Sequence, residues 1–112
     1  MSKILISYFS ASGVTKSVAE KIANAIDGYL FEIEPAVLGF PVWWYTAPTI
    51  INTFIEENNL EGKKIYVFVT SGGSSSEGSF RDLKNTYKNL NFISNKRFTG
   101  RETDEDYINW IK

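Results

Sequence analysis

Short apolar runs alternate along this chain with longer stretches in which apolar residues recur every three or four positions. Short runs rich in β-branched and aromatic residues predict strands, and the helical spacing predicts helices. The predicted strands cover residues 3–9, 29–33, 37–40, 64–70 and 91–94. The predicted helices cover residues 14–26, 47–58 and 78–89, and a last helix begins at Thr103. Strands that alternate with helices indicate an α/β fold built on a parallel sheet.

Three of the predicted strands are followed by loops of unusual composition. These loops come after the strands at 3–9, 37–40 and 64–70. In an open α/β sheet, ligands bind beyond the carboxyl ends of the strands, near the point where the strand order reverses. The three loops therefore predict one ligand site at this edge of the sheet.

The first loop gathers hydroxyl groups and a glycine at the start of a predicted helix. A helix N-terminus offers free backbone N–H groups and is the positive end of the helix dipole, so it favours an anion such as phosphate. An ordinary helix N-cap uses the same residue types, so this loop alone leaves both interpretations open. Its candidate binding residues are Ser10, Ala11, Ser12, Gly13, Val14 and Thr15.

The second loop places two tryptophans and a tyrosine side by side between two prolines. Exposed aromatic rings can stack on a flat heteroaromatic ligand, although the same rings could also cover the end of the sheet. Its candidate binding residues are Pro41, Val42, Trp43, Trp44, Tyr45 and Ala47.

The third loop is small and rich in backbone donors. Its glycine pair lets the backbone approach a planar ligand closely, although an ordinary flexible loop could have this composition too. Its candidate binding residues are Ser71, Gly72, Gly73 and Ser74. Together the three loops predict a phosphate cradle, an aromatic wall and a close backbone rim, which suit a mononucleotide with a flat ring system.

Composition narrows the chemistry. The 112 residues indicate a single domain, residues 1–112, and they include neither cysteine nor histidine. This excludes thiol nucleophiles, cysteine-ligated metals and histidine bases, so we assign no catalytic or metal-binding residue and expect a cofactor to carry any redox chemistry. The net charge of -1 disfavours nucleic acid as a partner. The most apolar stretch, residues 37–51, is too short to span a membrane, so we expect a cytoplasmic protein.

The candidate loops resemble the motifs of the flavodoxin family, in particular of its short bacterial members. Residues 10–15 are similar to the family's phosphate loop, Ser/Thr-x-Ser/Thr-Gly-x-Thr. Residues 38–48 resemble the segment that packs an aromatic residue on the flavin, and residues 70–74 resemble a further loop at the flavin edge. The resemblance implies FMN as the cofactor, bound by the candidate residues named above. It also implies a three-layer sandwich whose parallel five-stranded sheet has the order 2-1-3-4-5.

Two uses of a bound FMN are consistent with this resemblance. The first is electron transfer to redox partner proteins or to a small-molecule electron acceptor, although electron carriers of the family are usually far more acidic than this chain. The second is an FMN-dependent reductase that passes hydride from a nicotinamide cofactor to a quinone-type acceptor. A third possibility, outside redox chemistry, is a binding module that keeps only the fold. Electron transfer is the favoured hypothesis.

One departure from the family pattern concerns the link between the second and third predicted strands. In the order 2-1-3-4-5 both strands are parallel to the first and lie on either side of it, so this link takes about a dozen residues. Only Glu34, Pro35 and Ala36 separate the two predicted strands, and three residues reach only about 10 Å. We therefore expect a segment holding a helix and the start of the third strand to be missing near residues 35–37, either deleted or unobserved.

Overall fold

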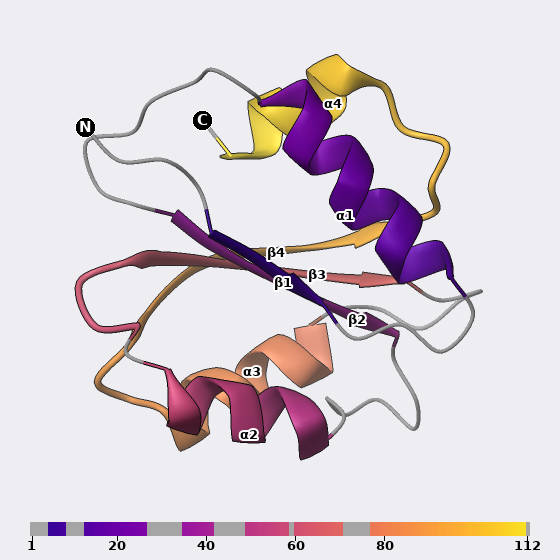
Figure 1. Ribbon diagram of the computed structural model, residues 1–112. Helices are drawn as coiled ribbons and strands as arrows, with labels where there is room; N and C mark the ends of the chain where they lie inside the picture. Colours follow the sequence, from indigo (N-terminus) through magenta and orange to yellow (C-terminus); the bar gives the residue numbers. More distant parts are fainter. Residues whose placement is uncertain are drawn as a thin grey trace.

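The computed structural model describes residues 5–8, 13–26, 35–41, 49–58, 60–70 and 77–111. Strands and helices alternate through these residues (Figure 1). In chain order the elements are β1 (Leu5–Tyr8), α1 (Val14–Ala25), β2 (Pro35–Pro41), α2 (Thr49–Glu57), β3 (Lys64–Thr70), α3 (Glu77–Thr86), β4 (Asn91–Phe98) and α4 (Asp104–Ile111).

The four strands form one parallel sheet in the order β1-β2-β3-β4. The register pairs Pro41 of β2 with Thr70 of β3, and Thr70 with Phe98 of β4. Three strands therefore end level with one another, and the polypeptide leaves each of them at the same edge of the sheet. This is the edge at which the sequence predicts the ligand site.

Helices cover both faces of the sheet, which gives three layers (Figure 1). On one face, α1 and α4 pack on Val37, Phe68 and Phe98, and on the other face α2 and α3 pack on Leu38, Phe40 and neighbouring residues. Because β2 and β3 lie between two apolar layers, nearly all of their side chains are buried. Each large apolar side chain that is buried in this way stabilises the fold by about 1.5–3 kcal/mol.

Gly39 in the middle of β2 is required by the packing of an aromatic ring. A Cβ atom at this position would overlap the ring of Phe68 on the neighbouring strand β3. Phe68 is itself fully buried on the face covered by α1 and α4, and its ring is tilted against that of Phe98 at a centroid distance of 5.9 Å. The glycine thus makes room for the ring cluster under α1 and α4.

The predicted alternation of elements is confirmed, and the strand at residues 64–70 is reproduced to the residue as β3. The predicted last helix is present as α4, which begins one residue after Thr103. There Thr103 pairs with Asp106, because each side chain accepts a hydrogen bond from the other's backbone N–H. The prediction of a short last strand is wrong, because β4 extends to Phe98. Its second half, Ser94 to Arg97, is polar, which an edge position tolerates and which conceals the strand in the sequence.

The sheet of the described residues has four strands, whereas five were expected. The predicted strand at residues 29–33 lies outside the described residues, and β2 begins at Pro35, two residues before the predicted start of the third strand. The described strands correspond to the first, third, fourth and fifth of the expected order.

The helices that follow β1 and β2 lie on opposite faces of the sheet. α1 follows β1 on one face, whereas α2 and α3 follow β2 and β3 on the other, although the strands advance in one direction across the sheet (Figure 1). Crossovers that advance in the same direction over opposite faces have opposite hands. A direct connection from β1 through α1 to β2 would therefore differ in hand from the two crossovers that follow it.

Candidate functional site

The first turn of α1 lies at the edge where the strands end, and it begins with Gly13 in a left-handed conformation, at a φ of 89°. A Cβ atom at Gly13 would meet nothing within 4 Å, so the requirement for glycine comes from the backbone conformation and not from crowding. The left-handed residue comes directly before the first helical residue, Val14. This is the backbone geometry that makes an anion-binding concavity.

The first helical hydrogen bond of α1 runs from the N–H of Ser17 to the carbonyl oxygen of Gly13, at 3.0 Å. The N–H groups of the three residues before Ser17 therefore have no partner inside the helix. The first turn carries no acidic residue that could take the place of an external anion. Val14 is 40% exposed, so this turn is open to a ligand. Its arrangement suits a negatively charged group at the positive end of the helix dipole.

Thr15 connects this turn to the sheet. Its hydroxyl oxygen lies 2.6 Å from the hydroxyl oxygen of Thr70, the last residue of β3. Thr15 is 1% exposed and Thr70 is 5% exposed, so the bond between them is shielded from water. The first turn of α1 is thereby held against the end of β3, the strand that leads into the third candidate loop.

The predicted site residues divide into two sets. Gly13, Val14, Thr15 and Pro41 are described, and the structure brings the first turn of α1 and the strand ends to the same edge of the sheet. The remaining predicted residues lie outside the described residues: Ser10, Ala11, Ser12, Val42, Trp43, Trp44, Tyr45, Ala47, Ser71, Gly72, Gly73 and Ser74.

Thr70 lies in the segment at residues 70–74 that resembles a flavin-edge loop, but the sequence assigns it no binding role of its own. Its other signal in the sequence is a hydroxyl that closes an otherwise apolar run, residues 65–69. Its contact with Thr15 joins residues that are 55 positions apart. Such a contact depends on the packing of α1 on the sheet and has no local pattern.

A second polar group lies in the first turn of α3, the helix that follows the third candidate loop. Ser79 is fully buried, and its hydroxyl oxygen has no hydrogen-bond partner in the part of the chain that the structure describes. A buried hydroxyl without a partner costs about 1–3 kcal/mol. Ser79 is thus a destabilising feature of the free protein.

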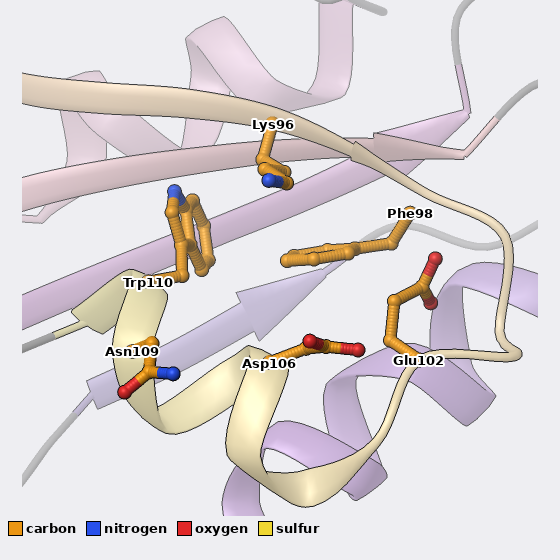
Figure 2. A pocket seen from close by; sticks show the side chains of 6 residues that line it. All are labelled: Lys96, Phe98, Glu102, Asp106, Asn109 and Trp110. Carbon is orange, nitrogen blue, oxygen red and sulfur yellow. The ribbon is translucent and has the colours of Figure 1, made fainter.

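A separate hollow of about 540 Å³ lies between β4 and α4 (Figure 2). It is lined by Lys96, Phe98, Glu102, Asp106, Asn109 and Trp110. The rings of Phe98 and Trp110 meet edge to face with centroids 5.1 Å apart, and the indole N–H of Trp110 donates to the hydroxyl of Ser94 at 3.2 Å. The four predicted flavin-binding residues that the structure describes, Gly13, Val14, Thr15 and Pro41, do not line this hollow.

The carboxylate of Glu102, which lines this hollow, is hydrogen-bonded to residues of the turn between β4 and α4 and to Tyr107. It accepts hydrogen bonds from the N–H and hydroxyl of Thr99, from the N–H of Gly100 and from the hydroxyl of Tyr107, at 2.9–3.1 Å. Burial by itself would raise the pKa of Glu102, but these hydrogen bonds outweigh it and hold the pKa below its ordinary value. The pKa of Tyr107 is raised by burial and by its bond to Glu102. Glu102 therefore stabilises the turn between β4 and α4 and is not free for a ligand.

No helix in the part of the chain that the structure describes is long and apolar enough to cross a membrane. The described residues also contain no group of three or more acidic side chains placed to hold a metal ion.

Comparisons with solved structures show proteins of the same fold. A protein from Bacteroides eggerthii DSM 20697, provisionally described as a flavoprotein, is 30% identical with a TM-score of 0.87, over 99% of this chain and 96% of that one. A protein from Bacteroides uniformis ATCC 8492 with the same description is 28% identical with a TM-score of 0.85, over 98% and 97% of the two chains. A flavoprotein in complex with FMN from Lactobacillus acidophilus NCFM has a TM-score of 0.75 at 22% identity, over the full length of both chains.

No curated protein matches the sequence. The family model described as Flavodoxin does match, over residues 3–38 and again over residues 36–112. The two matches overlap at residues 36–38, at the start of β2, and together they cover nearly the whole chain. With the α/β fold and the phosphate-type turn at its sheet edge, this chain belongs to the flavodoxin family.

Proposed function

We propose that this protein is an FMN-binding electron-transfer protein that works in the cytoplasm with redox partner proteins or a small-molecule electron acceptor. The observation that carries the proposal is the first turn of α1, which starts with a left-handed glycine and whose first N–H groups, those of Val14, Thr15 and Lys16, have no partner inside the helix. FMN is the cofactor of the family to which the chain belongs. The FMN complex of the structural neighbour from Lactobacillus acidophilus NCFM supports the same cofactor.

The described residues fit the phosphate of FMN. A phosphate dianion needs several hydrogen-bond donors and positive potential, and the start of α1 supplies both. In the proposed site Gly13, Val14 and Thr15 hold the phosphate from the side of the helix. FMN supplies the redox chemistry, and the residues of the protein bind it, orient it and limit the access of water.

The other sequence-predicted residues complete the proposed site. Ser10, Ala11 and Ser12 continue the phosphate loop. The second loop, which starts at Pro41, supplies a wall for the flavin ring, and the third loop supplies backbone donors at its edge. The residues proposed for these two loops are Pro41, Val42, Trp43, Trp44, Tyr45, Ala47, Ser71, Gly72, Gly73 and Ser74.

We also propose the full sheet order of the family, 2-1-3-4-5, with residues 29–33 as the strand beside β1. The hand of the crossovers supports this order. α2 and α3 lie on one face of the sheet, and their connections run from β2 towards β4. α1 lies on the opposite face, so a connection of the same right-handed kind through α1 runs the other way, from β1 to a strand on the side of β1 away from β2.

The proposal is tested by titrating the purified protein with FMN and, in parallel, with riboflavin, which lacks the phosphate. We expect FMN to bind with a shifted visible absorption spectrum and quenched flavin fluorescence, and riboflavin to bind much more weakly. Equal affinities for the two flavins would contradict the phosphate site, and no binding of either would leave only a non-redox binding module.

Stepwise anaerobic reduction of the FMN complex then separates the two redox functions. An electron-transfer protein is expected to accept its two electrons in separable one-electron steps that the visible spectrum resolves. Reduction in a single two-electron step by a nicotinamide cofactor would instead show an FMN-dependent reductase and would overturn the proposed electron-transfer role.

A further inference from the structure

The hydrogen bond between Thr15 and Thr70 leaves one hydroxyl hydrogen without an acceptor. The two hydroxyl groups carry two hydrogens, and the 2.6 Å bond between their oxygens uses only one of them. Neither side chain makes another hydrogen bond within the described residues, and both are at least 95% buried. A buried donor without an acceptor is costly, so this hydrogen needs a partner that the described protein does not supply.

The position of the pair indicates what that partner is. Thr15 is the second residue of α1, in the same turn as the open N–H groups. Hydroxyl and N–H groups are all donors here, and the nearest end of the helix dipole is positive. A group that accepts hydrogen bonds and carries negative charge satisfies every one of these groups at once, as an oxygen of a phosphate monoester does.

We infer that Thr70 is a positioning residue for the phosphate: its hydroxyl donates to Thr15, so that the hydroxyl of Thr15 donates outward to a phosphate oxygen. Thr70 acts through Thr15 and makes no contact with the phosphate itself. Its donation also strengthens that of Thr15, because hydrogen bonds in a chain polarise one another. This inference rests on the proposed function, since the phosphate is that of FMN.

The test replaces Thr70 by valine, which keeps the branched shape and removes the hydroxyl. We expect Thr70→Val to weaken FMN binding about 2- to 10-fold, the effect of losing one ordinary hydrogen bond, here the bond from Thr70 that orients the hydroxyl of Thr15. Riboflavin affinity should change less than twofold, because riboflavin has no phosphate. Thr70→Ser is the matched control, since it keeps the hydroxyl and should retain the FMN preference of the native protein.

A second measurement uses inorganic phosphate alone as the probe. The midpoint of thermal unfolding of the flavin-free protein should rise with phosphate concentration, and this rise should be smaller in Thr70→Val than in Thr70→Ser. If valine prevents folding, Thr70→Ala removes the same hydroxyl, and the same ratio of FMN to riboflavin affinity is measured.

The outcomes separate this inference from the proposed function. If the native protein binds FMN no better than riboflavin, the proposed phosphate site fails, and the role of Thr70 fails with it. If the native protein prefers FMN but Thr70→Val keeps that preference, or weakens both flavins equally, the phosphate site stands and only the role of Thr70 is overturned.

Discussion

Three hydroxyl groups are buried among the described residues near the start of α1, the end of β3 and the start of α3, and they differ in their hydrogen bonds. The hydroxyls of Thr15 and Thr70 are buried and joined to each other, whereas that of Ser79 is buried without a partner in the described residues. The first arrangement satisfies one of the two hydroxyl hydrogens and leaves the other as a donor for a ligand. The second lowers the stability of the free protein, because burial removes water from a polar group that has no replacement for it.

At this scale we predict that Ser79→Ala stabilises the flavin-free protein. Removing the unpartnered hydroxyl should raise the free energy of unfolding by roughly 1 kcal/mol, measured by urea denaturation. Ser17→Ala is the control, because it changes a half-buried serine of α1 and reports the effect of helix propensity. A lower free energy of unfolding for Ser79→Ala than for the native protein would contradict the prediction.

Between elements, the turn from β4 to α4 is held by one carboxylate. Glu102 receives four hydrogen bonds from Thr99, Gly100 and Tyr107, and Lys21 of α1 donates to the carbonyl oxygen of Gly100 from the other side. These contacts fix the last helix against α1 and close the ring cluster of Phe98, Tyr107 and Trp110. Helix docking here depends on polar contacts in the turn as well as on the apolar face.

We predict that Glu102→Gln lowers the free energy of unfolding by about 1–3 kcal/mol at pH 7, because a neutral amide is a poorer acceptor for these donors. The folded-state pKa of Glu102 lies below its unfolded value, so the carboxylate contributes fully above the ordinary glutamate pKa of about 4.3. Its contribution is lost as the pH falls from there through the folded-state pKa.

Urea denaturation from pH 7 to pH 3 checks this prediction. The native protein and Glu102→Gln should converge in stability toward the acid end. Glu20→Gln, an exposed change on α1, should stay within about 0.5 kcal/mol of the native protein at pH 7. A constant difference between native protein and Glu102→Gln at all pH values would show that the charge of Glu102 does not stabilise the turn.

Over the whole molecule, the hand of the crossovers bears on the link from α1 to β2. About 98% of parallel crossovers are right-handed. α1 covers the face opposite to α2 and α3. If the crossovers through α2 and α3 are right-handed, a direct connection from β1 through α1 to β2 is therefore left-handed. The family model also matches the chain in two pieces that meet at residues 36–38. Both observations support the missing crossover that the sequence predicts at residues 35–37.

We therefore predict that the intact mass of the protein from its natural source exceeds the mass of the 112-residue sequence by that of a segment of at least about a dozen residues. The intact mass and a peptide map across residues 27–41 measure this directly. A mass that agrees with the 112 residues would contradict the prediction of unobserved residues and would leave a deletion as the explanation.

Much of the fold could be predicted because strands and helices each have a characteristic spacing of apolar residues in the sequence. The run at residues 64–70 is apolar because β3 is covered on both faces, and the prediction is correct to the residue. β4 was predicted too short because polar residues suit an edge strand, and only its pairing with β3 reveals it. The phosphate loop could be located as a motif, but the contact of its last threonine, Thr15, with Thr70 could not.

The sequence by itself determined the alternation of elements and the family, since these depend on neighbouring residues and on local motifs. The tertiary structure decided which strands lie side by side, why Gly39 has no side chain, and that Thr15 meets Thr70. The physical reason is distance along the chain: contacts across 55 residues arise from the register of the sheet and the packing of α1 upon it, and no local pattern encodes them.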